Sequence, residues 1–159
     1  MIKRVFIVFA AVLALVSCHC KGEEKKMEKY IFLYSDVRFT VGDDADEVTG
    51  RLGEWNKMSR AASCAGVGED IIYIYNGFRI LAYSEKDRAR ITAIDLTSDA
   101  VSTPEGIGLG DGADSVIKIY GVPHVRDGNV IEYESGGVRL RFILSDGSVR
   151  SIKYLLSDG

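Results

Sequence analysis

The chain contains very little histidine, and this scarcity limits the chemistry that it can perform. Its two histidines are His19 and His124, and neither has a cysteine or carboxylate partner at the spacing of a metal site. His124 follows a proline in an expected turn, and no oriented acid or base partner is visible for it. The sequence therefore predicts no catalytic residue, no metal site and no cofactor, and we expect that the chain is not an enzyme.

Long apolar runs are also missing, because the run from Phe6 to Val16 is too short to cross a bilayer as a stable helix. A basic start at Lys3 and Arg4, this short run, and small residues before a cysteine are typical of a secretory signal. The last four residues, Leu15-Val16-Ser17-Cys18, resemble the lipobox of bacterial lipoproteins. The resemblance implies a signal peptide over residues 1–17 and lipidation of Cys18. An ordinary signal or an N-terminal membrane anchor is the alternative.

Cysteine is scarce too, and each of the three has an expected place. Cys18 is assigned to lipid, Cys20 falls in a charged tether over residues 18–29, and Cys64 falls in the folded part. The tether has too few apolar side chains to fold, although a short exposed helix is the alternative. An exported compartment would permit a disulfide between Cys20 and Cys64. A buried free thiol at Cys64 is the favoured interpretation.

Basic residues are not in excess, which excludes a nucleic-acid partner. Without Lys3 and Arg4 the count of Lys and Arg falls from 20 to 18 against 23 acidic residues, a net charge of −5. The remaining 142 residues suffice for one domain or two small repeated lobes. The expected location is the exported side of a cell membrane, with lipid-anchored Cys18 in the bilayer. The expected partner is a protein or another envelope component.

Two segments of the chain match each other at an offset of 68 residues. Residues 39–53 and residues 107–121 share six identities in fifteen positions. Each segment is predicted to be a short helix that ends at a glycine suited to a left-handed cap, Gly53 or Gly121. Their amino-terminal aspartates are expected to act as helix caps, with Asp43 and Asp111 as N-caps and Asp46 and Asp114 in the first turn.

Strand patterns follow each expected helix. In the first half they cover residues 71–75, 78–83 and 91–96, and in the second half residues 130–133, 138–142 and 149–155. Asn76-Gly77 and Asp146-Gly147 are typical of two-residue hairpin turns. The sequence therefore predicts an α+β fold of two tandem units, residues 30–97 and 98–159. Each unit is a short helix followed by a three-stranded antiparallel meander, and the helices pack on one face of an antiparallel sheet.

This arrangement resembles the tandem repeat of the β-lactamase-inhibitor-protein fold and, one unit at a time, the SmpA/OmlA lipoproteins of outer-membrane assembly. The second unit carries the resemblance through Gly110-Asp111, Gly121, Pro123 and Asp146-Gly147. Residues 30–156 as a whole resemble a group of uncharacterised bacterial lipoproteins. The resemblance implies a fold and an anchored location. It implies no inhibitory activity, because no inhibitory loop can be matched.

Two other patterns are explained by helix starts. Residues 108–113 superficially fit a dinucleotide-binding glycine motif, but antiparallel strands follow instead of a βαβ unit. The acidic residues at 43–47 lack the spacing of a calcium loop.

Tyrosine and arginine gather on the expected strands. Arg79, Arg139 and Arg141 alternate with apolar residues that are expected to face inward, which directs the arginines to solvent. Interfaces favour tyrosine and arginine. We interpret the following set as a candidate binding face: Tyr73, Tyr75, Arg79, Tyr83, Tyr133, Arg139 and Arg141. The alternatives are a solvated sheet face with the tyrosines packed in the core, and a structural or scaffold lipoprotein without a dedicated ligand.

Overall fold

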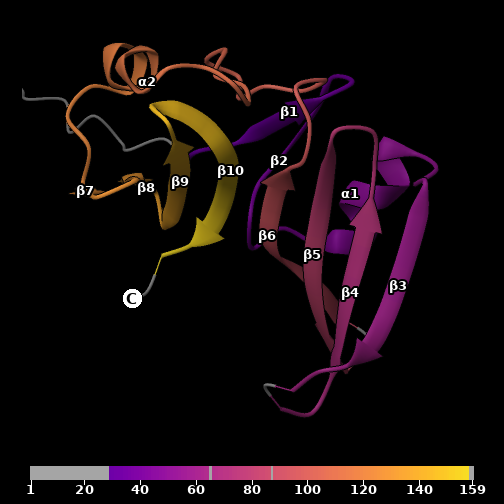
Figure 1. Ribbon diagram of the computed structural model, residues 1–159. Coiled ribbons are helices and arrows are strands. Elements are labelled where there is room, and N and C mark those ends of the chain that lie inside the picture. Colours follow the sequence, from indigo (N-terminus) through magenta and orange to yellow (C-terminus); the bar gives the residue numbers. More distant parts are fainter. Residues whose placement is uncertain (1–28, 65, 87, 158–159) are drawn as a thin grey trace, which may run out of the picture.

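The fold is mainly β. A computed structural model describes residues 29–64, 66–86 and 88–157. This part of the chain forms a two-stranded sheet, an eight-stranded antiparallel sheet and two short helices (Figure 1). The expected signal peptide, Cys18 and Cys20 lie outside the described residues, and so does the tether up to residue 28.

The chain order places a helix before each half of the large sheet. The first elements are β1 (Phe32–Tyr34), β2 (Val37–Phe39) and α1 (Ala45–Leu52). Four strands follow: β3 (Lys57–Ala62), β4 (Glu69–Ile74), β5 (Phe78–Glu85) and β6 (Arg88–Leu96). The second half contains α2 (Ala113–Tyr120), β7 (Val125–Asp127), β8 (Val130–Ser135), β9 (Val138–Ser145) and β10 (Ser148–Leu156).

The eight strands form one continuous sheet in the order β3-β4-β5-β6-β10-β9-β8-β7. The two halves therefore join where β10 pairs antiparallel with β6, with Ile152 opposite Leu96. Irregular register occurs within β5–β6 and within β9–β10. Such irregularities bend a strand and increase its twist.

The expected fold class is wrong. The structure does not divide into two units of one helix and three strands, and no tandem repeat of that kind is evident. The pattern at residues 71–155 predicted six strands of the large sheet and missed β3 and β7. Every residue of β3 and β7 is exposed. Neither strand has a buried face, so neither needs the alternation of apolar and polar residues by which a half-buried strand is recognised in a sequence.

The core lies on one side of the large sheet, which we call the inner face and define by Ile80, Leu140 and Phe142, all fully buried. The β1–β2 hairpin covers the junction of the two halves. The Phe32 ring lies 5.0 Å from the ring of Phe78 on β5 and 5.9 Å from that of Tyr154 on β10. One aromatic side chain therefore packs against both halves of the sheet.

The helices are short and amphipathic, and each buries a narrow stripe that includes Val48 in α1 and Val116 in α2. Both end as expected at a glycine with positive φ, Gly53 and Gly121, after which the chain turns away. The turn at Asp146-Gly147 likewise has positive φ at both residues, as a two-residue hairpin turn requires.

The predicted N-caps are wrong by one residue. The N-cap of α1 is Asp44, whose carboxylate accepts from the Glu47 N–H, and the N-cap of α2 is Gly112, which has no side-chain bond. Asp43 and Asp111 instead stabilise the preceding turns. The Asp43 carboxylate accepts from the Thr40 N–H at 2.9 Å, and the Asp111 carboxylate accepts from the Gly108 N–H at 2.7 Å.

Asp46 and Asp114 do lie in the first turns of the two helices. A carboxylate there interacts favourably with the positive end of the helix dipole.

Candidate functional site

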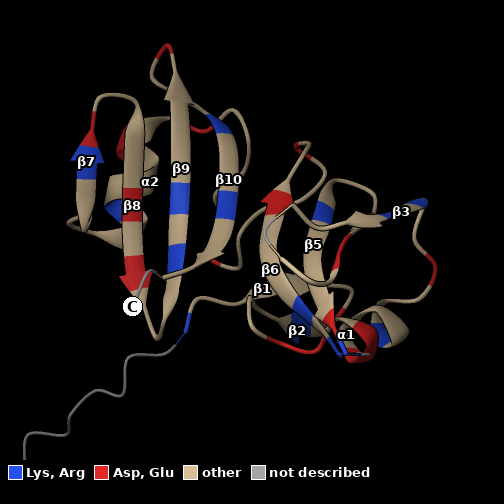
Figure 2. Ribbon diagram, turned by 90° about the horizontal axis from the view of Figure 1, so that it is seen from below, with Lys and Arg blue, Asp and Glu red and all other residues tan. Residues whose placement is uncertain are grey.

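A row of charged side chains crosses the sheet on the side opposite the core, which we call the outer face. The register aligns Arg79 with Asp95, Asp95 with Lys153, and Lys153 with Arg141. Glu132 follows on β8, opposite Arg141. In Figure 2, α2 lies behind β8, and charged positions of both signs lie on the neighbouring strands β8, β9 and β10. Five strands thus bring three cations and two carboxylates onto one surface.

Two buried carboxylates fix the cations of this row. The Asp95 carboxylate is 6% exposed and lies 2.7 Å from the Arg79 guanidinium and 3.7 Å from the Lys153 ammonium. The Glu132 carboxylate is 8% exposed and forms an ion pair with Arg141. The cations themselves remain accessible, with Arg79 at 43%, Lys153 at 34% and Arg141 at 33% exposed. Each cation therefore has a fixed position while one side of it faces solvent.

Apolar residues form the next row of the outer face. Ile72, Leu81, Ala93 and Leu155 lie side by side across β4, β5, β6 and β10. Ala93 is buried, and the other three are partly exposed. The outer face therefore offers a charged row beside an apolar row, which is a mixture suited to binding another macromolecule.

The tyrosines of the predicted binding face do not join the arginines. Tyr73, Tyr75 and Tyr133 are buried on the inner face, where Tyr73 lies opposite Ile80 and Tyr133 lies opposite Leu140. They have the strand parity of the core residues and are packing residues.

Tyr83 is the exception, since it is partly exposed and donates a hydrogen bond to the Val67 carbonyl at 2.7 Å. Arg139 is also partly exposed, and its guanidinium donates to the Leu156 carbonyl at 3.3 Å. Arg79, Arg139 and Arg141 thus lie on one side of the sheet, and three of the four predicted tyrosines lie on the other.

The altered tyrosine pKa values have a structural cause. Burial raises the pKa of Tyr75 to about 12, with a further contribution from Tyr73. Burial also raises the pKa of Tyr73, and the carboxylate of Asp46 adds to this effect. These hydroxyl groups stay protonated at neutral pH, so they give no indication of acid–base chemistry.

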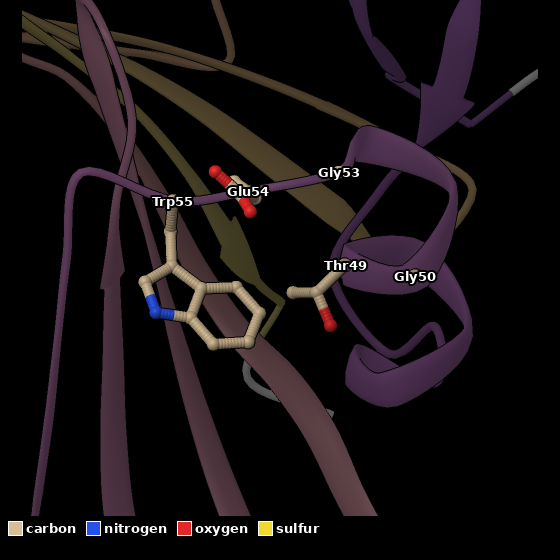
Figure 3. A pocket seen from close by; sticks show the side chains of 5 residues that line it. All are labelled: Thr49, Gly50, Gly53, Glu54 and Trp55. Carbon is tan, nitrogen blue, oxygen red and sulfur yellow. The ribbon is translucent and has the colours of Figure 1, made fainter.

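A second feature, which the sequence analysis missed, is a cavity of about 520 Å³ at the end of α1. Its lining residues are Thr49, Gly50, Gly53, Glu54 and Trp55. The Thr49 side chain points across the cavity toward the indole ring of Trp55 (Figure 3). The signal that could have indicated it is Trp55 itself, the single tryptophan of the chain, which follows the glycine that ends α1.

The remaining candidate residues carry no visible chemistry. His124 is 64% exposed, with Glu134 3.9 Å away. Cys64 is an exposed free cysteine, so the favoured interpretation as a buried thiol is wrong. Within the described ranges, no three histidine, cysteine or acidic side chains are arranged to hold a metal ion. No helix in the same ranges has the length and apolar character needed to cross a membrane.

Comparison with known proteins identifies no family. No family model matches the chain, and no curated protein matches it. Two solved structures are similar in part. One is an extracellular protein containing an SCP domain from Bacillus anthracis, at 12% identity and a TM-score of 0.44. The other is a cysteine-rich secretory protein from Staphylococcus aureus, at 13% identity and a TM-score of 0.39.

Each match covers 74% of this chain and 44% of the other, so the chain spans less than half the length of the solved chains that it matches. The two descriptions name an extracellular protein and a secretory protein. The expected resemblance to the β-lactamase-inhibitor-protein fold and to SmpA/OmlA lipoproteins is corrected by this result. At these TM-scores the likeness carries no argument about function.

Proposed function

We propose that this chain is an exported lipoprotein, anchored through acylated Cys18, whose folded domain binds a protein or another envelope component and catalyses no reaction. Leu15-Val16-Ser17-Cys18 supports the anchor. The observation that carries the binding function is the row of accessible cations on the outer face, held by buried carboxylates at Asp95 and Glu132.

Fixed cations reduce the cost of binding. A long charged side chain normally loses rotamer freedom when it contacts a partner, and that loss weakens the complex. Ion pairs with Asp95 and Glu132 already restrict Arg79 and Arg141 in the free protein. A guanidinium held in this way offers directional donors to a carboxylate, a phosphate or a carbonyl group. The outer face is therefore prepared to recognise a polar or anionic surface.

The binding function is tested by crosslinking in intact cells that carry the full-length chain. The Lys153→Gln variant removes one cation of the row and leaves Asp95 paired with Arg79. The matched control is Lys118→Gln, which makes the same change at an exposed position of α2. We expect Lys153→Gln to reduce the yield of a specific crosslinked complex and Lys118→Gln to leave it unchanged. Equal yields from the two variants, or no specific complex at all, would favour a structural lipoprotein without a ligand.

The anchor is tested separately. Two or more acyl chains hold a protein stably on a membrane, at about 0.8 kcal/mol for each buried CH₂ group. We expect Cys18→Ala to leave the chain unprocessed or to release it from the membrane fraction. Mass spectrometry of the amino-terminal peptide of the wild type checks the modification. An unmodified peptide, together with unchanged fractionation of the variant, would refute lipidation.

A further inference from the structure

The strand β3 leaves one edge of the large sheet open. It pairs with β4 on one side, and all six of its residues are exposed. Within the described residues no strand covers its other side. The outward N–H and C=O groups of such an edge can pair with an extended segment of another chain.

The cavity at Trp55 lies beside this edge. Trp55 is 41% exposed, and its indole ring lies 5.2 Å from the ring of Tyr73 on β4. Tyr73 is aligned with Met58 on β3, and Met58 is 39% exposed. An added strand would lie two strand spacings, about 10 Å, from β4. A side chain must therefore be long to pass over Met58 and reach the indole ring.

The surroundings of the cavity favour a cation. The last turn of α1 lines it, and the carbonyl groups at the end of a helix carry a partial negative charge. Glu54 lines the cavity as well, and Asp46 lies one turn before Gly50 on the same flank of the helix. Within the described part of the chain neither carboxylate has a cationic partner. The face of an indole ring also attracts cations.

The charges on β3 oppose pairing with a second copy of this chain. Lys57 and Arg60 lie on this strand, so two copies joined edge to edge would bring four cations together. Charged side chains of this kind prevent self-association at sheet edges. Within one chain the Glu69 carboxylate lies 3.1 Å from the Arg60 guanidinium and partly neutralises its charge. One basic side chain of a partner is therefore repelled less by β3 than the two cations of a second β3 strand would be.

We propose that β3 accepts an extended segment of a partner protein as an added strand, with a lysine or arginine side chain that passes over Met58 to the cavity between α1 and Trp55. This site is separate from the outer face. Backbone pairing with β3 supplies sequence-independent affinity, and the cavity selects the long basic side chain.

Trp55 provides a direct measurement, because its indole is the only one in the chain. The probes are seven-residue peptides of alternating threonine and serine with lysine, norleucine or glutamate at the centre, added to the full-length chain in detergent. We expect the lysine peptide to protect Trp55 from acrylamide quenching. The norleucine peptide should bind about fivefold more weakly, and the glutamate peptide more weakly still. Equal affinities for the three peptides, or no protection by the lysine peptide at millimolar concentration, would overturn the proposal.

Substitutions in α1 and in the loop that follows it locate the contact. Glu54→Gln should weaken the binding of the lysine peptide about threefold. Glu47→Gln, at an exposed position of α1 that does not line the cavity, should leave the affinity unchanged. Gly50→Met should fill the cavity and weaken binding at least tenfold. Gly50→Ala is the control, because a Cβ at Gly50 meets no atom within 4 Å. Wild-type affinity in Gly50→Met or in Glu54→Gln would overturn the assignment of the cavity.

Sedimentation of the full-length chain in detergent decides between a partner segment and a second copy. We expect no concentration-dependent dimer through β3. A dimer that a Met58→Lys substitution disrupts, and that excludes the peptides, would overturn the proposal in favour of self-pairing.

Discussion

At the scale of single residues, several carboxylates form hydrogen bonds within turns or ion pairs between strands. Asp43 and Asp111 each accept a hydrogen bond from the amide three residues earlier. The two turns are also joined to the sheet by backbone bonds, from the Ile91 N–H to the Asp43 carbonyl and from the Val149 N–H to the Asp111 carbonyl. These residues therefore attach each helix start to a central strand.

The turn bond of Asp111 has a measurable effect on stability. We expect Asp111→Ala to lower the free energy of unfolding by about 1 kcal/mol, because it removes a partly buried hydrogen bond to the Gly108 N–H. Asp111→Asn keeps an acceptor oxygen and should cost less. Urea unfolding measures both, with Asp99→Ala as the control at an exposed turn position outside the helices and strands. Equal stabilities for Asp111→Ala and Asp99→Ala would contradict the assigned role.

The buried Glu132 makes Arg141 important for stability, apart from the binding role proposed for it. We expect Arg141→Ala to cost about 2 kcal/mol, because it leaves the Glu132 carboxylate buried without its charged partner. The double variant Glu132→Gln with Arg141→Ala should recover part of that loss, since no buried charge remains. The same denaturation experiment tests this double-mutant cycle. If the two substitutions are simply additive, Arg141 does not act through Glu132.

At the scale of elements, the strands differ in what holds them. β5 and β9 alternate between buried and partly exposed residues along most of their length, and that alternation predicted them from the sequence. β3 has no buried residue. It depends on backbone pairing with β4, on the ion pair of Arg60 with Glu69, and on the contact of Trp55 with Tyr73. A sequence pattern that reports burial cannot reveal such a strand.

This difference predicts unequal hydrogen exchange. We expect the amides of β3 to exchange much faster than those of β5 and β10, because local opening of β3 exposes almost no apolar surface. Mass spectrometry of peptic peptides measures the rates without any substitution. Protection of β3 equal to that of the central strands would mean that the edge is covered in solution.

The candidate site could be predicted only in part. Alternation placed Arg79, Arg139 and Arg141 on one side of the sheet, and the structure shows them there, partly exposed. The side of the sheet on which the tyrosines lie was not predicted, because it follows from the pairing between strands. Tyr73 and Tyr133 are aligned with apolar core residues of the neighbouring strands. The partners Asp95 and Lys153 could not be identified either. Their contact depends on the register between β6 and β10, which lie more than fifty residues apart in the sequence.

At the scale of the whole molecule, the junction of β6 and β10 decides whether the chain behaves as one domain or two. The large sheet is continuous across it, and the Phe32 ring contacts both Phe78 and Tyr154. A shared core of this kind couples the stability of the two halves. We therefore expect the two stretches of sequence on either side of the predicted boundary near residue 97 to unfold together.

Unfolding in urea tests this coupling, because Trp55 reports on the half that contains β3–β6 and far-ultraviolet circular dichroism reports on all strands. We expect the two signals to follow a single transition with the same midpoint. Phe32→Ala should shift both midpoints together and cost about 3 kcal/mol, because it opens a cavity where the two halves meet. The control is Leu33→Ala, since Leu33 is 39% exposed on the same strand and should change the stability little. If the tryptophan signal moves in Phe32→Ala while part of the dichroism transition stays in place, the two halves unfold separately and the sheet is not one cooperative unit.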